Sequence, residues 1–235
     1  MRFPSRLLLA NMVFALMLWA GFFVLVVAVT VGIAVFGTLN ESVWEKAVQV
    51  TRWYALFVGV ALVREFLPMY IAHGQTRRQF GAQAAVTVAL FAPFLSALMA
   101  VGYLLETVLY NLAGRPQALG RAHLYAEPTQ VPLVLIEYLV EFLAWIVAGA
   151  LVGAGFYRWQ GGGLLTIPIG VGLVVLAEGA IGTELRLPFL GSLPLRVDLP
   201  QSLALTLGTG LGTFLLGLLL VWAVIRDVPL RNRLS

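Results

Sequence analysis

Residues 7–36 read LLLANMVFALMLWAGFFVLVVAVTVGIAVF, thirty consecutive residues without a charged side chain. A helix of about 20 apolar residues is long enough to cross the hydrocarbon core of a bilayer. The run is too long for the apolar part of a signal peptide and lacks a convincing small-residue cleavage site, so we interpret it as a membrane span. This stretch alone predicts an integral membrane protein.

The composition of the whole chain agrees with that interpretation. Of 235 residues, 60% are hydrophobic and 11% are charged, whereas soluble domains carry roughly 25% charged residues. A soluble enzyme, a disordered chain and a coiled coil are therefore excluded. The chain has no cysteine, which also excludes disulfides, thiolate metal sites and cysteine nucleophiles.

Further apolar runs predict six spans in all, at residues 7–36, 53–72, 82–105, 131–157, 164–178 and 203–225. The fifth run is the weakest, because Gly170 and Gly172 interrupt it and Pro168 lies near its start. No tract is long and polar enough for a separate soluble domain. We expect residues 1–235 to form a single all-α transmembrane domain without a nucleotide-binding domain.

The distribution of basic residues predicts the orientation of the spans. With six spans and a cytoplasmic N-terminus, the cytoplasmic segments carry Arg2, Arg6, Arg77, Arg78, Arg158, Arg226, Arg231 and Arg233. The longer outer segments carry Lys46, Arg52, Arg115, Arg121, Arg186 and Arg196. We therefore expect a multi-pass protein of the plasma membrane with both termini in the cytoplasm. Its basic rim would contact anionic lipid headgroups rather than nucleic acid.

Residues for catalysis or metal binding are not found in familiar patterns. The single lysine, Lys46, follows no glycine-rich phosphate-binding turn. His73 and His123 stand alone, and neither Ser96 nor Ser192 has the setting of a nucleophilic serine. We expect no catalytic residue, metal or cofactor on this chain.

Charged residues inside the predicted spans are candidates for function, because each costs on the order of 2.5–3.5 kcal/mol to insert. Arg64 and Glu65 fall in the second span, and Glu137 and Glu141 in the fourth. The two glutamates are four residues apart, so they share one helix face. They either line a pathway for a proton or a cationic group, or form structural ion pairs with Arg64 or an outer-loop arginine.

Small residues mark faces where helices approach closely. Gly149 and Gly153 are four apart in the fourth span, and Gly208 and Gly212 are four apart in the sixth. Such spacing lets two backbones come into contact. It predicts helix packing, and less specifically a contact between two chains.

The connection between the second and third spans reads HGQTRRQF at residues 73–80. Gly74 can end the incoming helix, and Thr76 is a good N-cap for a new helical turn. That turn would carry Arg77 and Arg78 on the cytoplasmic side and end in an aromatic, Phe80, able to dock in a pocket. From the residues alone, a positive-inside stop signal is the simpler interpretation of this segment.

The pattern Gly-x-Thr-Arg-Arg-x-Phe after the second span resembles the first cytoplasmic loop of ABC-2-type transporter permeases, the membrane subunits of ATP-binding-cassette exporters. Residues 149–163, GALVGAGFYRWQGGG, resemble the small-residue helix and following turn that link spans four and five in short bacterial permeases of this kind. The resemblance covers nearly the whole chain. It implies the six-helix ABC-2 architecture, also called type V exporter-like.

The resemblance further implies how such a permease works. Residues 74–80 would form a coupling helix that contacts a separate cytoplasmic ATPase, present in two copies, which binds ATP and magnesium. Gly74, Thr76, Arg77, Arg78 and Phe80 would make that contact. Two permease chains would pair through the first span of one and the fifth span of the other, and residues 178–201 would form short re-entrant outer helices. The cargo would be amphipathic or lipid-like, such as a drug, an antimicrobial peptide or a lipid.

Two alternatives remain open at this point. One is an ion- or proton-coupled secondary carrier built on Arg64, Glu137 and Glu141. The other is a membrane scaffold or sensor without transport activity.

Overall fold

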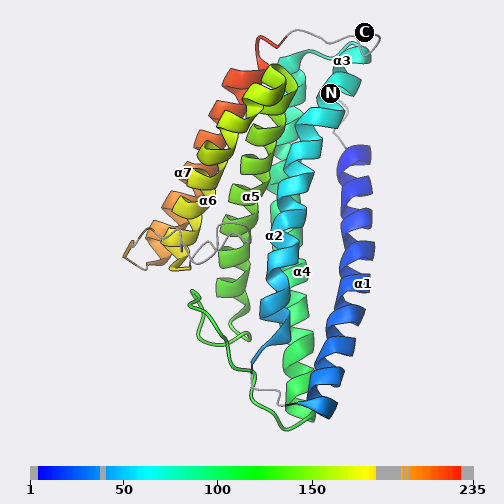
Figure 1. Ribbon diagram of the computed structural model, residues 1–235, viewed down its shortest axis with the longest axis vertical. Coiled ribbons are helices and arrows are strands. Elements are labelled where there is room, and N and C mark those ends of the chain that lie inside the picture. The colour runs from blue at the N-terminus through cyan, green and yellow to red at the C-terminus, as the bar shows by residue number, and fades with distance from the viewer. Residues whose placement is uncertain (1–4, 38–40, 184–196, 198, 201, 229–235) are drawn as a thin grey trace.

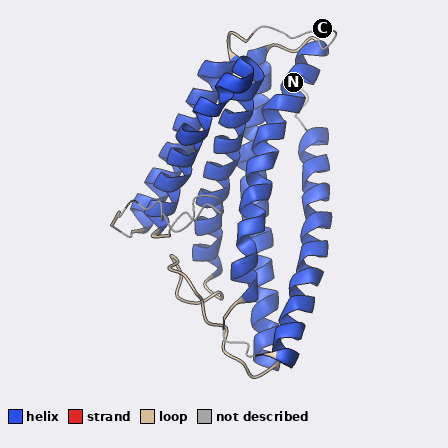
Figure 2. Cartoon of the chain, in the orientation of Figure 1, coloured by secondary structure: helices blue, strands red, loops and turns tan. Residues whose placement is uncertain are grey.

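The computed structural model describes residues 5–37, 41–183, 197, 199–200 and 202–228, and every regular element in these ranges is a helix (Figures 1 and 2). The elements are α1 (Ser5–Phe36), α2 (Val43–Ala61), η1 (Leu62–Phe66), α3 (Leu67–Ala72), α4 (Arg77–Leu112), α5 (Val131–Trp159), η2 (Gln160–Leu165), α6 (Thr166–Ile181) and α7 (Leu203–Ile225). The predicted all-α class is confirmed. The expected re-entrant segment, 178–201, falls largely outside the described residues.

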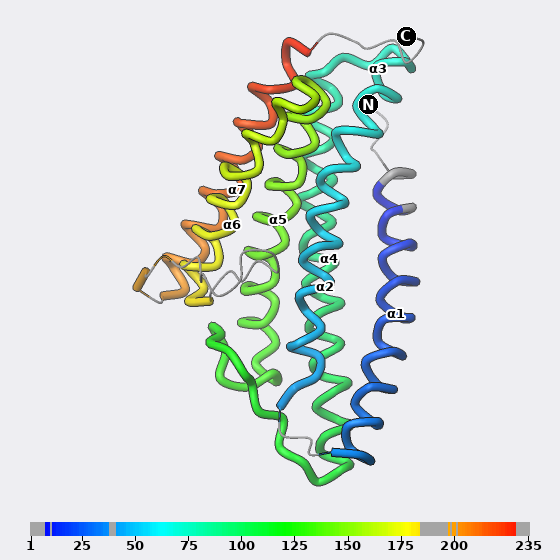
Figure 3. Tube along the Cα trace, in the orientation of Figure 1, coloured from blue at the N-terminus to red at the C-terminus, as the bar shows by residue number. Residues whose placement is uncertain are grey.

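Five helical runs in the described part of the chain are long and apolar enough to cross a membrane: 11–36, 43–72, 77–112, 131–181 and 203–225. Residues 131–157 and 164–178, expected as two spans, belong to one of these runs. That run folds back at η2, so that α6 lies alongside α5 (Figure 3). These are the lengths and polarity expected of a membrane protein.

Figure 1 separates the bundle into two ends. The start of α1, α3 with the turn that comes after it, η2 and the end of α7 lie at one end, which we call the elbow end. The end of α1, the start of α2 and the loop at residues 113–130 lie at the other, which we call the loop end.

Two helices extend well beyond their apolar runs. The second span was expected to begin at Trp53, but α2 begins at Val43. The Ser42 hydroxyl accepts the Glu45 backbone N–H as an N-cap, and such a cap satisfies an orphan donor of the first turn. Arg52 and Lys46, expected in an outer loop, therefore lie within α2. In the same way α4, expected over residues 82–105, runs from Arg77 to Leu112.

Helix α5 is the centre of the bundle and contacts α2, α4, α6 and α7. Most of its residues from Val140 to Gly155 are buried. Its sequence there is apolar or small on all sides, which is typical of a helix surrounded by other helices.

The face with Gly149 and Gly153 packs against α2, as its spacing predicts. A Cβ atom on Gly149 would lie 2.0 Å from the Leu56 carbonyl oxygen, and one on Gly153 would lie 2.7 Å from that of Val60. Both distances are far shorter than any tolerated contact. Only glycine therefore allows α2 and α5 to approach this closely.

The corresponding prediction for α7 is wrong within this chain. A Cβ atom on Gly208 or Gly212 would meet nothing within 4 Å. The glycines that α7 turns toward α5 are Gly210 and Gly217, where a Cβ atom would lie 2.6 Å from Val140 and Val147 side chains, respectively. The four-residue spacing was right for a face of α7, but that face does not contact the bundle.

The residues Arg64 and Glu65 lie in η1, a π-helical turn just before Pro68. Proline has no N–H, and its ring collides with the carbonyl four residues earlier, here that of Arg64. A π-turn widens the backbone at this point and lets the helix continue.

Helix α1 lies at the edge of the bundle and touches only α2 and α4 in substantial contacts (Figure 1). Its contact is largely aromatic: Trp19 meets Trp44 edge-on at 6.0 Å, and Phe23 meets Trp44 at 5.8 Å. Only 11% of its most apolar window is buried, so most of the apolar surface of α1 is left uncovered by the other described residues.

Candidate functional site

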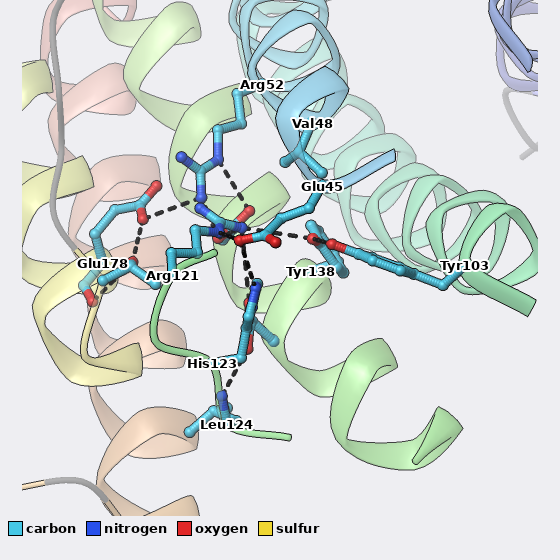
Figure 4. Close-up of polar contacts among 12 residues, drawn as sticks. Glu45, Val48, Arg52, Tyr103, Arg121, His123, Leu124, Tyr138 and Glu178 are labelled. Carbon is cyan, nitrogen blue, oxygen red and sulfur yellow. Dashed lines mark hydrogen bonds and ion pairs between the residues drawn. The ribbon is translucent and has the colours of Figure 1, made fainter. Parts of the chain in front are cut away.

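A network of buried charges joins α2, α5 and α6 near the loop end (Figure 4). Arg52 of α2 donates from Nε and Nη2 to the two carboxylate oxygens of Glu141, at 3.1 and 2.5 Å. Its Nη2 also lies 3.3 Å from Oε2 of Glu178 on α6. All three residues are at most 3% exposed. Two-pronged geometry of this kind is the strongest form of an arginine–carboxylate pair.

The Glu178 carboxylate is fixed by α5 and by the residue after the C-cap of α6, as well as by Arg52. Trp145 of α5 donates its indole N–H to Oε1 at 3.3 Å, and the Thr183 hydroxyl hydrogen-bonds to Oε2. Thr183 reaches back because α6 ends at Gly182 in the left-handed conformation, with φ of 90°. Glycine adopts that conformation at little cost.

The loop at residues 113–130 inserts a second cation, Arg121, into the network. Its guanidinium nitrogens lie 3.5 Å from Glu141, 3.7 Å from Glu45 and 3.8 Å from Glu137. Burial alone would lower the pKa of Arg121, but the surrounding carboxylates raise it well above its ordinary value. Arg121 is therefore charged and bridges α2 and α5.

The same loop also contributes His123, whose ring lies between two carboxylates. Nδ1 lies 2.6 Å from Glu137, and Nε2 lies 3.2 Å from Glu45. The ring stacks on Tyr125 at 4.4 Å, and Tyr125 meets Tyr103 of α4 edge-on at 5.9 Å. The loop is thus attached to α2, α4 and α5.

A further buried carboxylate, Glu106 of α4, holds the start of α2. It accepts the backbone N–H groups of Val43 and Trp44 at 2.9 and 2.8 Å and a hydrogen bond from the Ser42 hydroxyl at 2.5 Å. Gln117 of the loop donates to it at 2.6 Å. Negative charge at a helix N-terminus is favourable because of the helix dipole.

The sequence prediction found part of this network. Glu137 and Glu141 do share one face, and the arginines beside them are Arg52 and the loop residue Arg121, which fits the structural ion-pair interpretation. Arg64 takes no part in it, which corrects the expectation that it could pair with them: its side chain is 64% exposed, 4.0 Å from Glu65.

Arg52 and Arg121 were predicted only as two of several outer-loop arginines that could pair with the glutamates, and Glu45, His123 and Glu178 were not predicted as members. One signal was present: Glu45 and Arg52 are seven residues apart, which places them on one helix face. It was missed because that helix was expected to begin at Trp53.

At the elbow end, the local prediction is confirmed. Gly74 has φ of 78° and ends the preceding helix, and Thr76 is the N-cap of α4, with a capping box to Gln79. The arginines belong to the first turn of α4 itself rather than to a separate coupling helix. Arg78 is exposed, whereas Arg77 donates to the Val228 carbonyl at 2.6 Å.

Phe80 differs from the expectation of an aromatic free to dock in a partner. It is 2% exposed and packs edge-on against Tyr70, with ring centroids 5.6 Å apart. The ring faces inward because Phe80 is on the α4 face turned toward the bundle. The part of the elbow open to a partner is His73, Gly74, Thr76, Arg78 and Gln79.

Within the described residues, no group of three or more histidine, cysteine, aspartate or glutamate side chains is arranged to hold a metal ion. The carboxylates of the network are occupied by cationic side chains of the chain itself. The arrangement can hold charges in a low-dielectric interior and bind or release protons.

Comparisons of the chain with family models, with curated proteins and with solved structures found no match. The function of the chain is therefore inferred from its geometry and from the sequence resemblance.

Proposed function

We propose that this chain is the permease subunit of an ATP-driven exporter of the ABC-2 type. It crosses the membrane six times, with α5 and α6 as separate passes, and works as a pair of permeases with two copies of a cytoplasmic ATPase. The observation that carries the proposal is the elbow between α3 and α4. An exposed, capped turn at residues 73–76 leads into α4, a 36-residue helix that runs the length of the bundle and carries the exposed Arg78 in its first turn.

The construction of the elbow suits a docking point. Gly74 and the Thr76 capping box fix the direction of the first turn of α4, and N-caps of this type contribute about 1 kcal/mol. A push on the elbow would therefore be passed to α4 without unwinding its first turn.

Two other basic side chains at this end, Arg77 and Arg158, are bound within the chain. Arg77 donates to the Val228 carbonyl, and Arg158 donates to the Val224 carbonyl at 2.8 Å. Both carbonyls lie at the C-terminal end of α7, which carries partial negative charge. Arg78 is left as the exposed cation of the elbow itself.

An apolar groove supports an amphipathic or lipid-like cargo. It has a volume of about 600 Å³ and lies between α4 and α7, with Val147 and Ala150 of α5 among its lining residues. The other lining side chains are apolar except for Arg78. A groove of this kind accepts an apolar chain with an acidic or polar head beside the arginine.

A proton-coupled secondary carrier is the second candidate, and the buried network favours it. Glu137 and Glu141 lie with His123 among titratable groups close to the loop end, and buried titratable groups in membrane helices are typical of proton pathways. The two candidates differ in their energy source: transport that continues in vesicles without ATP would favour the carrier.

The exporter proposal is tested by Arg78→Glu in the full tagged chain, isolated from its native membranes. We expect the wild-type chain to co-purify a P-loop ATPase and the Arg78→Glu chain to lose most of it, because the change reverses the charge of the elbow. Arg226→Glu is the matched control, since Arg226 is an exposed arginine at the same end and pairs with Asp227. Its change should leave the ATPase bound.

Two outcomes contradict the proposal. One is a wild-type chain that brings down no ATPase under conditions that preserve other membrane complexes. The other is equal ATPase recovery and turnover with Arg78→Glu and with Arg226→Glu. Arg77→Glu is less informative, because it also breaks the contact with α7.

A further inference from the structure

The two histidines of the chain have different surroundings. His73 lies exposed at the elbow end, where Nδ1 is 2.7 Å from the Met69 carbonyl oxygen. His123 lies at the loop end, with both ring nitrogens within hydrogen-bonding distance of carboxylates, Nδ1 at 2.6 Å from Glu137 Oε1 and Nε2 at 3.2 Å from Glu45 Oε1.

Each of the two carboxylates also accepts a hydrogen bond from a backbone N–H group of the loop. Oε2 of Glu45 accepts the Gly120 backbone N–H at 2.7 Å, and Oε2 of Glu137 accepts the Leu124 backbone N–H at 2.8 Å. Both backbone donors belong to the loop. The two glutamates therefore hold the loop on either side of His123.

The geometry fixes the number of protons at this point. A neutral imidazole has one N–H, and an ionised carboxylate only accepts hydrogen bonds. With a neutral ring and two ionised carboxylates, one ring nitrogen would direct its lone pair at a carboxylate oxygen. Both contacts are hydrogen bonds only if one further proton is present, on the imidazole or on one of the carboxyl groups.

We infer that Glu45, His123 and Glu137 form a proton-binding site that fastens the loop at residues 113–130 to α2 and α5, and that loss of this proton releases the loop. The inference concerns the loop end alone. It does not depend on the proposed exporter function, because it requires neither cargo nor ATPase.

The groups around the site set the direction of its pH dependence. Glu45 faces it from α2, Glu137 from α5, and Arg121 and Tyr125 from the loop. Tyr103 of α4, Tyr138 and Glu141 of α5, and Glu178 of α6 lie beyond them in the same network. Arg121 opposes a positive charge on His123, whereas the glutamates favour it.

Taken together, the groups around His123 favour its protonated form. Burial alone would lower the pKa of His123, but its hydrogen bonds to Glu137 and Glu45 outweigh that effect and raise the pKa above its ordinary value. A raised pKa means that the site is filled below the ordinary histidine value of about 6.5. It empties as the pH rises through the higher folded value. The loop is therefore attached below about pH 6.5 and released once the pH exceeds the raised pKa of His123.

The chain offers a direct test because it contains no cysteine. A nitroxide spin label on Ala122→Cys, an exposed loop position next to His123, reports the mobility of the loop in lipid nanodiscs. We expect an immobile spectrum at pH 6 and a mobile one at alkaline pH, with a midpoint above about 6.5. The same label on Gln79→Cys at the elbow should show no such transition.

Variants at position 123 distinguish the effect of the proton on loop mobility from the effect of side-chain shape. In the labelled chain, His123→Gln should be mobile at every pH, because an amide donates from only one of its two ends. His123→Lys should keep the loop immobile beyond the wild-type midpoint, since lysine keeps its charge to about pH 10. His73→Gln should leave the transition unchanged.

Nitrogen-15 NMR of labelled histidine in the His73→Gln chain decides the matter even if the His123 variants fail to fold. A signal that moves from the protonated to the neutral form at the same pH as the spin label supports the site. A loop whose mobility stays constant from pH 5 to 10, or a transition that survives His123→Gln, overturns it.

Discussion

The two ends of this bundle use arginine in opposite ways. At the loop end, Arg52 is 3% exposed and holds two glutamates on two other helices. At the elbow end, Arg78 is exposed at the first turn of α4. A buried charge must have its partners inside the chain, because desolvation costs several kcal/mol for each ion. An exposed charge is solvated by water and remains available to lipid headgroups or another protein.

The comparison indicates that the two ends are held together by different kinds of contact. The loop end is cross-linked by charges from α2, α5, α6 and the loop at residues 113–130. The elbow end is held by backbone contacts and caps, and it presents its free polar surface outward. Three pairs of substitutions test this difference.

The largest expected effect comes from Arg52→Met compared with Arg78→Met. Removing Arg52 leaves Glu141 and Glu178 buried without their shared cation, and breaking a buried pair in this way costs about 3–5 kcal/mol. Arg78→Met should change the free energy of unfolding by no more than about 0.5 kcal/mol, as for most surface changes. Denaturant unfolding of both variants in the same detergent measures the difference.

A double variant refines the result. Arg52→Met combined with Glu141→Gln should recover part of the loss, because one of the unpaired carboxylates becomes neutral. If Arg52→Met is as stable as Arg78→Met, the network does not contribute to stability as described.

The second comparison is Gly149→Ala with Gly208→Ala. The new Cβ atom on residue 149 would lie 2.0 Å from the Leu56 carbonyl oxygen, so α2 and α5 must separate, at a cost of about 1–3 kcal/mol. Gly208 has open space around it, and alanine there should stabilise α7 by up to about 1 kcal/mol. Midpoints of thermal unfolding that shift in the same direction for both variants would contradict the assigned faces.

The smallest expected difference is between the two helix caps, Ser42→Ala and Thr76→Ala. Loss of the exposed Thr76 cap should cost about 1 kcal/mol. Ser42 is both a cap and a donor to the buried Glu106, and hydrogen bonds to charged groups contribute roughly 1.5–3 kcal/mol. Ser42→Ala should therefore lower the free energy of unfolding more than Thr76→Ala. Equal losses would show that the bond to Glu106 adds nothing to the cap.

Sequence patterns predicted the local features well. The bounds of α7 agree with the apolar run at residues 203–225, and Gly74 and Thr76 end and begin helices as their conformational preferences indicate. The start of α2 was wrong by a long margin because it depends on Ser42 and on Glu106, a residue 64 positions away along the chain. Hydropathy could not detect that contact.

The same limit applies to the buried network. Glu137 and Glu141 stood out because charges are rare in apolar runs. Arg52 lies just before the predicted span at residues 53–72, and Glu178 is the last residue of the predicted span at 164–178, so neither stood out. Arg52 meets Glu141 across a separation of 89 residues and Glu178 across 126. Nothing in the local sequence specifies those partners.

The sequence by itself determined that this chain is helical and apolar enough for a membrane, and that a turn at Gly74 leads into a helix capped by Thr76. These properties arise from the conformational and transfer preferences of neighbouring residues. The tertiary structure alone decided which glycines touch a helix, which arginines are buried, and that the loop at residues 113–130 reaches into the bundle with Arg121 and His123. Those outcomes depend on distances between segments far apart in the chain, and a buried charge is tolerated only where such segments bring its partners to it.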